Sequence, residues 1–259
     1  MATTRRPVSP WPPDGRAEDS LAIEEPLEIR VESDPIAVTM RTPGHDRELA
    51  AGFLLTEGVI DGLDDLLALA HLPGDPDRNT LLARLAGGVD AHREALTRAT
   101  RELYATSSCG ICGKSSIDRI RILAPPVEPP PPIPPEVWTS LPAMLRSAQA
   151  GFAATGGLHG AALVSFGGVL EVAREDVGRH NAVDKVLGWR LLQDRVPVDD
   201  RILLVSSRAG FEIVQKARVA GVRAIACLGA ATSLAVDLAR DGNQVLVGWL
   251  REDRLARYT

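Results

Sequence analysis

A proline-rich stretch near the middle of the chain constrains the fold more than any other feature of the sequence. Residues 124–135 read Ala-Pro-Pro-Val-Glu-Pro-Pro-Pro-Pro-Ile-Pro-Pro. Proline lacks a backbone N–H and fixes φ, so we expect a stiff, extended linker there rather than a helix or a central strand. The linker predicts two domains, a smaller N-terminal α/β domain over 21–123 and a second domain over 136–259. The polar, Pro-rich residues 1–20 predict a flexible N-terminal tail.

The domain after the linker alternates between strand and helix patterns. Gly167-Gly168 separates two apolar runs and therefore predicts a β-hairpin, and the later strands alternate with helices. This order predicts an α/β fold in which a mixed sheet is covered by helices on both faces. The predicted elements, in chain order, are a helix over 137–152, strands over 161–166 and 169–173, a helix over 183–191, a strand over 202–206, a helix over 211–220, a strand over 222–228, a helix over 233–240 and a strand over 245–250.

The domain before the linker has a less regular pattern. Alternating apolar residues over 27–31 and 36–40 predict a β-hairpin. A helix should follow, with Asp46 as its cap and Gly58 at its end. The remaining predicted elements are a short helix within 61–72, a strand over 81–85, a helix over 91–103 and a loop over 106–113.

Charge and cysteine content exclude several classes of function. The net charge of −5 argues against a nucleic-acid partner or an anionic membrane surface. The sequence has no apolar run of membrane-spanning length and no secretory signal pattern. Its cysteines, Cys109, Cys112 and Cys227, are odd in number, which argues against a disulfide framework and indicates a reducing cytoplasm.

Cys109 and Cys112 form a CxxC motif within Thr106-Ser-Ser-Cys-Gly-Ile-Cys-Gly113, and several kinds of chemistry can use such a pair. A structural zinc site needs about four ligands, and the sequence has no second cysteine pair, so we expect no protein-bound zinc. A thiol–disulfide redox site stays an alternative, although such pairs usually lie between a strand and a helix. Persulfide carriage requires an exposed, mobile thiol of low pKa, which the glycines and Lys114 favour. Two unreactive thiols in a surface loop are the simplest alternative.

Three polar segments follow predicted strands. The first places Arg179, His180 and Lys185 at the start of a helix, where free N–H groups attract phosphate and these three side chains are expected to supply charge to a pyrophosphate. Strand ends rich in Ser, Gly and Arg are typical of a ligand crevice in an α/β sheet. A lone histidine before a strand, such as His159, is more often structural than catalytic. The other two segments are Ser206-Ser207-Arg208-Ala-Gly210 and Trp249–Arg254.

Several motifs together resemble one family, the formate dehydrogenase accessory sulfurtransferases of the FdhD type. Their joint occurrence is far more specific than a single CxxC motif, and they extend from about residue 42 to the C-terminal part of the chain. The matching stretches are TPGHDRELAAGFLLTEGVI (42–60), SSCGICGKSSID (107–118), EDVGRHNAVDK (175–185), SSRAGFEIVQKARVAG (206–221) and AATSLAV (230–236).

The resemblance implies a specific activity and fold. Proteins of this family take sulfur from a cysteine desulfurase as a cysteine persulfide and pass it to the molybdenum cofactor in its bis-molybdopterin guanine dinucleotide form. The sulfurated cofactor then activates formate dehydrogenase, and guanosine diphosphate (GDP) mimics the nucleotide part of the cofactor. The resemblance further implies a homodimer and a cytidine-deaminase-like fold for residues 136–259, with three layers.

Carried over to this sequence, the resemblance makes Cys109 the persulfide carrier and Cys112 its partner. The stretch at 249–254 matches a cofactor-binding segment, but Arg251-Glu-Asp-Arg254 stands where the family pattern has Lys-Pro-Gly-Arg. Leu158 also replaces the usual threonine before the histidine. With the polar segments above, the expected ligand-binding residues are His159, Arg179, His180, Ser206, Ser207, Arg208, Trp249, Leu250, Arg251, Glu252, Asp253 and Arg254.

Zinc deaminase, thiol–disulfide oxidoreductase and cofactor chaperone functions are the alternatives to sulfur transfer. Zinc deaminases need a glutamate shortly after the first ligand and a Pro-Cys-x-x-Cys motif in the same domain, and His159-Gly-Ala161 lacks that glutamate. Deaminase chemistry is therefore excluded. A CxxC thiol–disulfide oxidoreductase and a non-catalytic chaperone of the molybdenum cofactor stay as alternatives. A stable, reversible Cys109–Cys112 disulfide with catalytic turnover would favour the oxidoreductase, and the absence of a persulfide on the CxxC peptide after mixing with a desulfurase would favour the chaperone.

Overall fold

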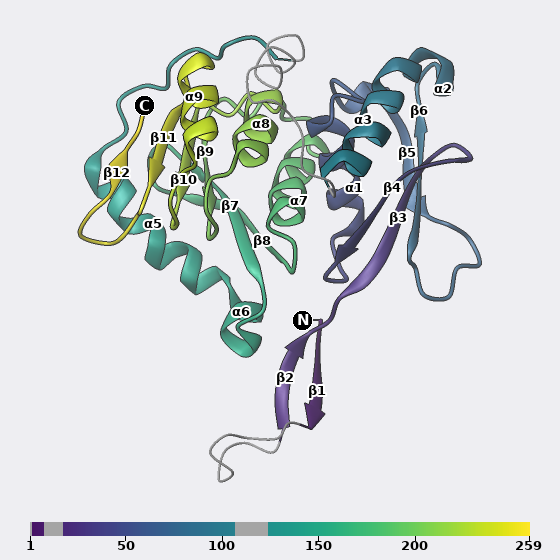
Figure 1. Ribbon diagram of the computed structural model, residues 1–259, viewed down its shortest axis with the longest axis horizontal. Helices are drawn as coiled ribbons and strands as arrows, with labels where there is room; N and C mark the ends of the chain where they lie inside the picture. Colours follow the sequence, from purple (N-terminus) through teal and green to yellow (C-terminus); the bar gives the residue numbers. More distant parts are fainter. Residues whose placement is uncertain (1, 8–17, 107–123) are drawn as a thin grey trace.

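The computed structural model describes residues 2–7, 18–106 and 124–259, with only the backbone described for 101–106 (Figure 1). Cys109 and Cys112 lie outside these residues. The described chain is a mixed α/β fold with three β-sheets. A four-stranded sheet precedes the proline-rich residues 124–135 in sequence and a six-stranded sheet follows them.

The four-stranded sheet has the order β4-β3-β6-β5. The predicted hairpin and the strand predicted at 81–85 are confirmed, but the predicted helix within 61–72 shrinks to a 3-10 turn, η1 (Leu63–Asp65). The residues after this turn form β5, because pairing with β6 outweighs the helix propensity of their leucines and alanines. The strands are β3 (Glu25–Val31), β4 (Asp34–Arg41), β5 (Leu66–His71) and β6 (Thr80–Leu85).

A separate two-stranded sheet projects from the body of the molecule (Figure 1). It consists of β1 (Thr3–Pro7) and β2 (Glu18–Ala22), which pair antiparallel, and β2 also lies against the short helix α6 (Ala150–Thr155). The prediction of a flexible tail is therefore wrong for these strands. Backbone pairing and contact with α6 do not require the apolar composition that the sequence lacks here.

The six-stranded sheet has the order β12-β11-β10-β9-β7-β8. Three central strands run parallel, and β7 and β8 form the antiparallel hairpin that Gly167-Gly168 predicted. Strand β12, which pairs with β11, was missed because it has only two residues. The strands are β7 (His159–Ser165), β8 (Leu170–Asp176), β9 (Arg201–Val205), β10 (Ala224–Cys227), β11 (Val245–Gly248) and β12 (Ala256–Arg257).

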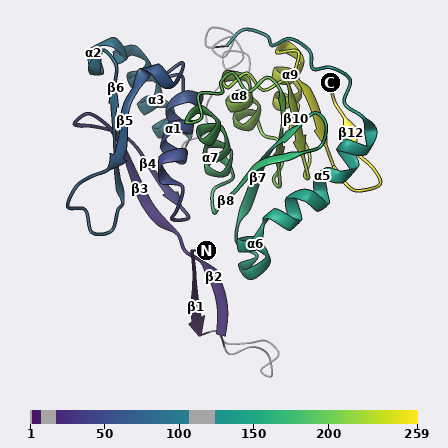
Figure 2. The same ribbon diagram turned by 180° about the vertical axis from the view of Figure 1, so that it is seen from behind.

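Helices cover both faces of this sheet, as the sequence pattern predicted (Figure 2). Alternate residues of a strand point to opposite faces. Accordingly, Ala162 and Val164 of β7 pack in the cluster that contains α5, whereas Ala161 and Leu163 pack in the cluster on the other face. The covering helices are α5 (Pro135–Ala148) on one face and α7 (Arg179–Leu191), α8 (Phe211–Val219) and α9 (Ser233–Asp241) on the other.

The single helix predicted over 137–152 is divided in two. Gln149 leaves the helical conformation, with φ −97 and ψ 66, and separates α5 from α6. Phe152, predicted to lie on the apolar face, is 45% exposed. The carboxylate of Glu175 accepts hydrogen bonds from the backbone N–H groups of Gly151 and Phe152. The first turn of α6 is therefore held by a side chain of strand β8.

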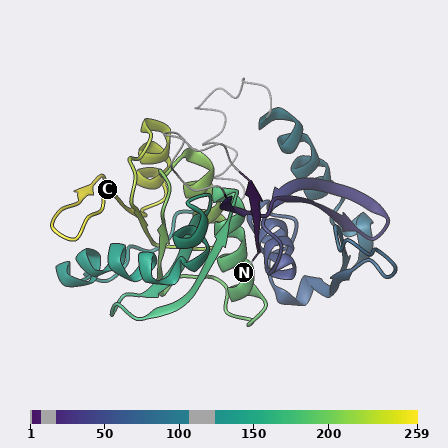
Figure 3. The same cartoon turned by 90° about the horizontal axis from the view of Figure 1, so that it is seen from below.

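Helices α1 (Asp46–Thr56) and α7 join the two larger sheets (Figure 3). Their backbones touch at two glycines: an added Cβ at Gly52 would lie 1.9 Å from Asp184 O, and one at Gly188 would lie 1.9 Å from Glu48 O. One apolar cluster consequently runs through both halves of the chain. The helices α2 (Gly88–Ala91) and α3 (Arg93–Thr106) belong to the N-terminal half, and the latter confirms the helix predicted over 91–103.

The prediction that Asp46 caps α1 is wrong. The capping position is His45, in the left-handed region with φ 60, and the His45 side chain makes no capping hydrogen bond. Asp46 is the first helical residue, and its carboxylate instead pairs with the buried guanidinium of Arg41, Oδ1 lying 3.1 Å from Nε. An ion pair with the preceding strand thus replaces the local cap.

Candidate functional site

The strand ends that carry the predicted ligand residues meet at one edge of the six-stranded sheet. His159, the first residue of β7, pairs with Asp176, the last residue of β8. Beside them, Gly160 N–H donates to Ser206 Oγ at 2.9 Å, directly after β9. Backbone hydrogen bonds link the next two strand ends to this pair. Gly229, after β10, donates its N–H to Ser207 O, and Trp249, after β11, donates its N–H to Gly229 O. The sheet order thus brings together segments as far apart in the sequence as His159 and Trp249.

The N-terminus of α7 lies at the same edge, directly after β8. Gly178 occupies the capping position and has no side chain with which to cap the helix. Arg179 is exposed, while His180 is half-buried. The N-terminal amides and the Arg179 guanidinium together give this end of the helix positive potential.

Both histidines at the edge are held in the neutral form. Burial, then the positive charges of Arg179 and Lys216, lower the pKa of His180 to about 4. Burial and Arg179 also lower the pKa of His159. Among the described residues, His180 Nε2 is buried without a hydrogen-bond partner. At neutral pH the side-chain positive charge at the start of α7 therefore comes from Arg179 and not from the histidines, which offer uncharged donors or acceptors.

Lys185, which the sequence suggested as a charge for pyrophosphate, is not available to a ligand. Its side chain is 1% exposed and its Nζ lies 2.6 Å from the carboxylate of the fully buried Asp176. The same Nζ donates to Thr42 O and Glu175 O. Lys185 therefore ties the start of α7 to the N-terminal half of the chain, and the prediction of a ligand contact is wrong.

The segment at 249–254 forms a turn whose residues have different roles. Trp249 is 53% exposed and adopts a left-handed backbone with φ 51. Leu250 is fully buried against the α5 face of the sheet, so only its backbone can reach a ligand. Arg251 donates to Leu228 O at 2.7 Å and closes the turn through a hydrogen bond from its N–H to Arg254 O.

The two acidic residues that depart from the family pattern lie in this turn. Glu252 pairs with Arg146 of α5, Oε1 lying 3.2 Å from Nη1, and both side chains are largely exposed. Asp253 is exposed. The turn is thus attached to the end of α5, and its negative charge is partly compensated.

The remaining predicted segment follows β9. Ser206 accepts the Gly160 N–H described above. Ser207 is 8% exposed and its hydroxyl donates to Arg208 O at 3.0 Å, which leaves the exposed Arg208 side chain as the charged group of this segment. Gly229 lies against Arg208, where a Cβ would approach its backbone N to 3.0 Å.

A buried charge cluster beneath the start of α7 was not predicted from the sequence. The Nζ of Lys216 in α8 lies 2.9 Å from Glu57 Oε1 and 3.0 Å from Asp184 Oδ2. Thr56 completes the cluster, accepting from Lys216 and donating to Asp184. Burial outweighs the attraction of Lys216 and raises the pKa of Asp184 to about 6, whereas the two carboxylates raise the pKa of Lys216. The sequence signal that could have revealed this cluster is a single charged residue, such as Asp184 or Lys216, within an otherwise apolar helix face.

Cys227, the one cysteine that falls within the described residues, is inert. It is fully buried in β10, and its thiol donates to Gly229 O and Val247 O. Burial raises its pKa to about 11. A thiolate nucleophile would require the opposite environment.

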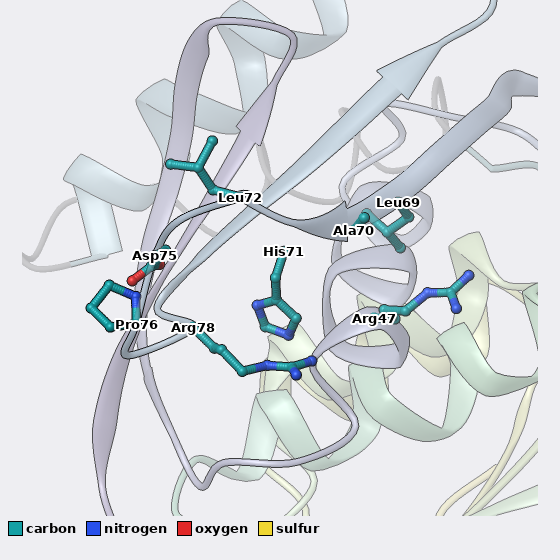
Figure 4. A pocket seen from close by; sticks show the side chains of 8 residues that line it. All are labelled: Arg47, Leu69, Ala70, His71, Leu72, Asp75, Pro76 and Arg78. Atoms are coloured by element: carbon teal, nitrogen blue, oxygen red, sulfur yellow. The ribbon is translucent and has the colours of Figure 1, made fainter.

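The described residues contain no cluster of three or more His, Cys, Asp or Glu side chains that could hold a metal ion. They also include no helix that is long and apolar enough to cross a membrane. A cavity of about 510 Å³ lies in the N-terminal half, where His71 of β5 and Arg78 converge (Figure 4). None of the residues predicted to bind a ligand lines that cavity.

The described fold is therefore that of an α/β protein with a mixed sheet, in which Ser, Arg and His side chains gather at the carboxyl ends of the parallel strands, the end at which α/β sheets usually bind ligands. Within this class, the chain belongs to the FdhD/NarQ family, which it matches over residues 22–259.

Curated relatives and a solved structure agree with this assignment. The chain is 47% identical to "Sulfur carrier protein FdhD" of Mycolicibacterium paratuberculosis, covering 93% of this chain and 90% of the relative. It is 48% identical to the protein of the same name from Streptomyces avermitilis, covering 90% and 84%. A crystal structure from Desulfotalea psychrophila, assigned as a formate dehydrogenase accessory protein, superposes with a TM-score of 0.75 at 23% identity and covers 100% and 97% of the two chains. That last likeness concerns the fold.

Proposed function

We propose that this chain is a sulfur carrier and sulfurtransferase that serves formate dehydrogenase. The observation that carries the proposal is the identity of 47% over 93% of the chain to a protein named as a sulfur carrier. In this proposal a cysteine desulfurase supplies the sulfur, and the acceptor is the molybdenum cofactor in its bis-molybdopterin guanine dinucleotide form.

The first chemical step takes place at the CxxC motif. The Cys109 thiolate attacks the outer sulfur of the desulfurase persulfide, an S–S bond forms on Cys109, and the desulfurase cysteine leaves as a thiolate. Cys112 lies close enough in sequence to relay or resolve the persulfide. The buried Cys227, with its raised pKa, is unsuited to either role.

The edge of the six-stranded sheet would hold the nucleotide part of the cofactor as substrate. Arg179 and the free amides of α7 suit a diphosphate, and the exposed Trp249 offers an aromatic face to a base. Arg208 and Arg254 are further exposed cations at the same edge. In this proposal the crevice anchors the cofactor, and the CxxC motif delivers sulfur to it.

Further parts of the proposal concern the setting in which the protein acts. The sheet order β11-β10-β9-β7-β8, with three parallel strands and an antiparallel hairpin, supports a cytidine-deaminase-like topology for residues 136–259. A homodimer and a cytoplasmic location complete the proposal, the latter consistent with an odd number of cysteines.

Replacement of Cys109 tests the proposal. In a host that lacks its own copy of the gene, Cys109→Ala should abolish formate dehydrogenase activity, while GDP binding to the purified variant persists. Cys227→Ala is the matched control and should support full activity. Full activity with Cys109→Ala would refute the assignment of this cysteine.

A further inference from the structure

Gln149, between α5 and α6, carries a buried side-chain amide. Its side chain is 6% exposed, and within the described residues its Nε2 has no acceptor. Nearly all buried polar groups in folded proteins find a partner, so an unpaired amide calls for a specific explanation. The other glutamine with a similarly buried side chain, Gln244, differs in its nitrogen, because its Nε2 donates to Val222 O at 2.7 Å while its Oε1 is the atom without a partner among the described residues.

The unpaired amide lies at the edge of the sheet where the proposed crevice is. Gly160 of β7 faces it so closely that an added Cβ would lie 2.6 Å from Gln149 Cδ and 2.7 Å from its Nε2. Gly160 is in turn hydrogen-bonded in both directions to Ser206, a predicted ligand residue. Because Gly160 has no side chain, the Gln149 amide has room to lie against β7 beside the proposed crevice.

Neighbouring contacts fix the backbone of Gln149 at this position. Immediately after it, Gly151 and Phe152 donate their N–H groups to the Glu175 carboxylate at 2.7 Å each. One turn before it, Arg146 pairs with Glu252 of the C-terminal turn. The segment that carries the amide is therefore connected to strand β8 through Glu175 and to the turn at 249–254 through Arg146.

We propose that Gln149 is a further ligand-contacting residue of this crevice, its side-chain amide donating a hydrogen bond to an oxygen atom of the bound guanine nucleotide. This inference rests on the proposed function, because it requires the nucleotide to bind at this edge. A half-turn of the terminal torsion exchanges the positions of Nε2 and Oε1, so either position of the amide can present the donor to the ligand. Without ligand the amide stays unpaired, and the bond forms only in the complex.

The accepting oxygen can belong to the base or to the diphosphate. The carbonyl oxygen of guanine and a phosphate oxygen both accept from a neutral amide. Adenine carries an amino group in place of that carbonyl, so adenosine diphosphate (ADP) keeps the diphosphate and removes the base acceptor. Comparing the two nucleotides therefore separates the two sources of the oxygen.

The test uses the full-length protein and two matched variants, Gln149→Met and Gln244→Met, which both replace a buried amide by an apolar chain of similar length. Isothermal titration calorimetry measures the affinity for GDP and ADP, and thermal melting measures the stability without ligand. We expect Gln149→Met to bind GDP about five- to tenfold more weakly. Its melting temperature should stay the same or rise, because no internal hydrogen bond is lost.

The control should behave in the opposite way. Gln244→Met should melt at a lower temperature, since it loses its bond to Val222, and should bind GDP like the wild type. A loss by Gln149→Met for GDP alone assigns the contact to the base, and an equal loss for ADP assigns it to the diphosphate. Unchanged GDP affinity of Gln149→Met, with the wild type still binding, would overturn the inference and leave the crevice intact. Absence of GDP binding by the wild type would refute the crevice, and the inference with it.

Discussion

The buried charge cluster beneath α7 gives a prediction whose size follows from the structure. Lys216 is 8% exposed and lies between Asp184 at 3.0 Å and Glu57 at 2.9 Å. In the variant Lys216→Met both carboxylates would lose their cation, while Asp184 stays 3% exposed. Removing one partner from a buried ion pair costs about 3–5 kcal/mol. For a chain of this size that corresponds to a fall in melting temperature of roughly 10 °C.

The pH dependence of the loss provides a second signature. Burial already raises the pKa of Asp184 to about 6. A carboxyl whose folded pKa is raised contributes stability at low pH that is lost as pH rises through the folded pKa. Without Lys216 that pKa should rise further, so the variant should be closest to the wild type near pH 5 and should lose most by pH 8.

Urea unfolding at pH 5 and pH 8 measures both effects. Arg240→Met is the matched control, because Arg240 is 65% exposed in a 4.0 Å pair with Asp237 and should contribute less than about 0.5 kcal/mol. Adding Asp184→Asn to Lys216→Met should recover part of the lost stability at pH 8. A loss below about 1 kcal/mol, or one that is the same at both pH values, would refute the reasoning.

Three further predictions concern the helix crossing, the crevice and the buried thiol. Gly188→Ala should lower the free energy of unfolding by roughly 3 kcal/mol in a urea titration, because its Cβ would lie 1.9 Å from a backbone oxygen of α1. The control Gly157→Ala should change that free energy little, because the nearest atom to its Cβ lies at 3.7 Å. Arg179→Ala and Arg254→Ala should each weaken GDP binding by about 1.5–3 kcal/mol in calorimetry, and unchanged affinity in both would place the ligand elsewhere. Cys227, whose pKa is raised to about 11, should resist iodoacetamide in the native protein and react in urea; rapid native labelling would contradict its burial.

Much of the fold could be predicted because burial leaves a periodic trace in the sequence. The alternating strands and the Gly167-Gly168 turn identify the hairpin β7–β8, and the apolar runs identify the parallel strands after it. Strand β5 was missed because its sequence, Leu-Leu-Ala-Leu-Ala-His, is favourable for a helix. Only its pairing with β6, a tertiary contact, decides between the two structures.

The candidate site was harder to predict than the fold, because residue types do not reveal partners. Lys185 and Arg179 lie in one polar motif, yet Lys185 pairs with the buried Asp176 whereas Arg179 is exposed. Leu250 falls within the matching C-terminal stretch but packs in the core. That the strand ends share one edge depends on the sheet order, which is a property of the whole chain.

Mass spectrometry of the peptide that contains Cys109 and Cys112 tests sulfur carriage most directly. The protein is incubated with a cysteine desulfurase and cysteine, then digested without reductant. Our account predicts that this peptide gains the mass of one sulfur atom, that dithiothreitol removes it, and that the Cys227 peptide gains none. An unmodified CxxC peptide in the presence of an active desulfurase would contradict the account.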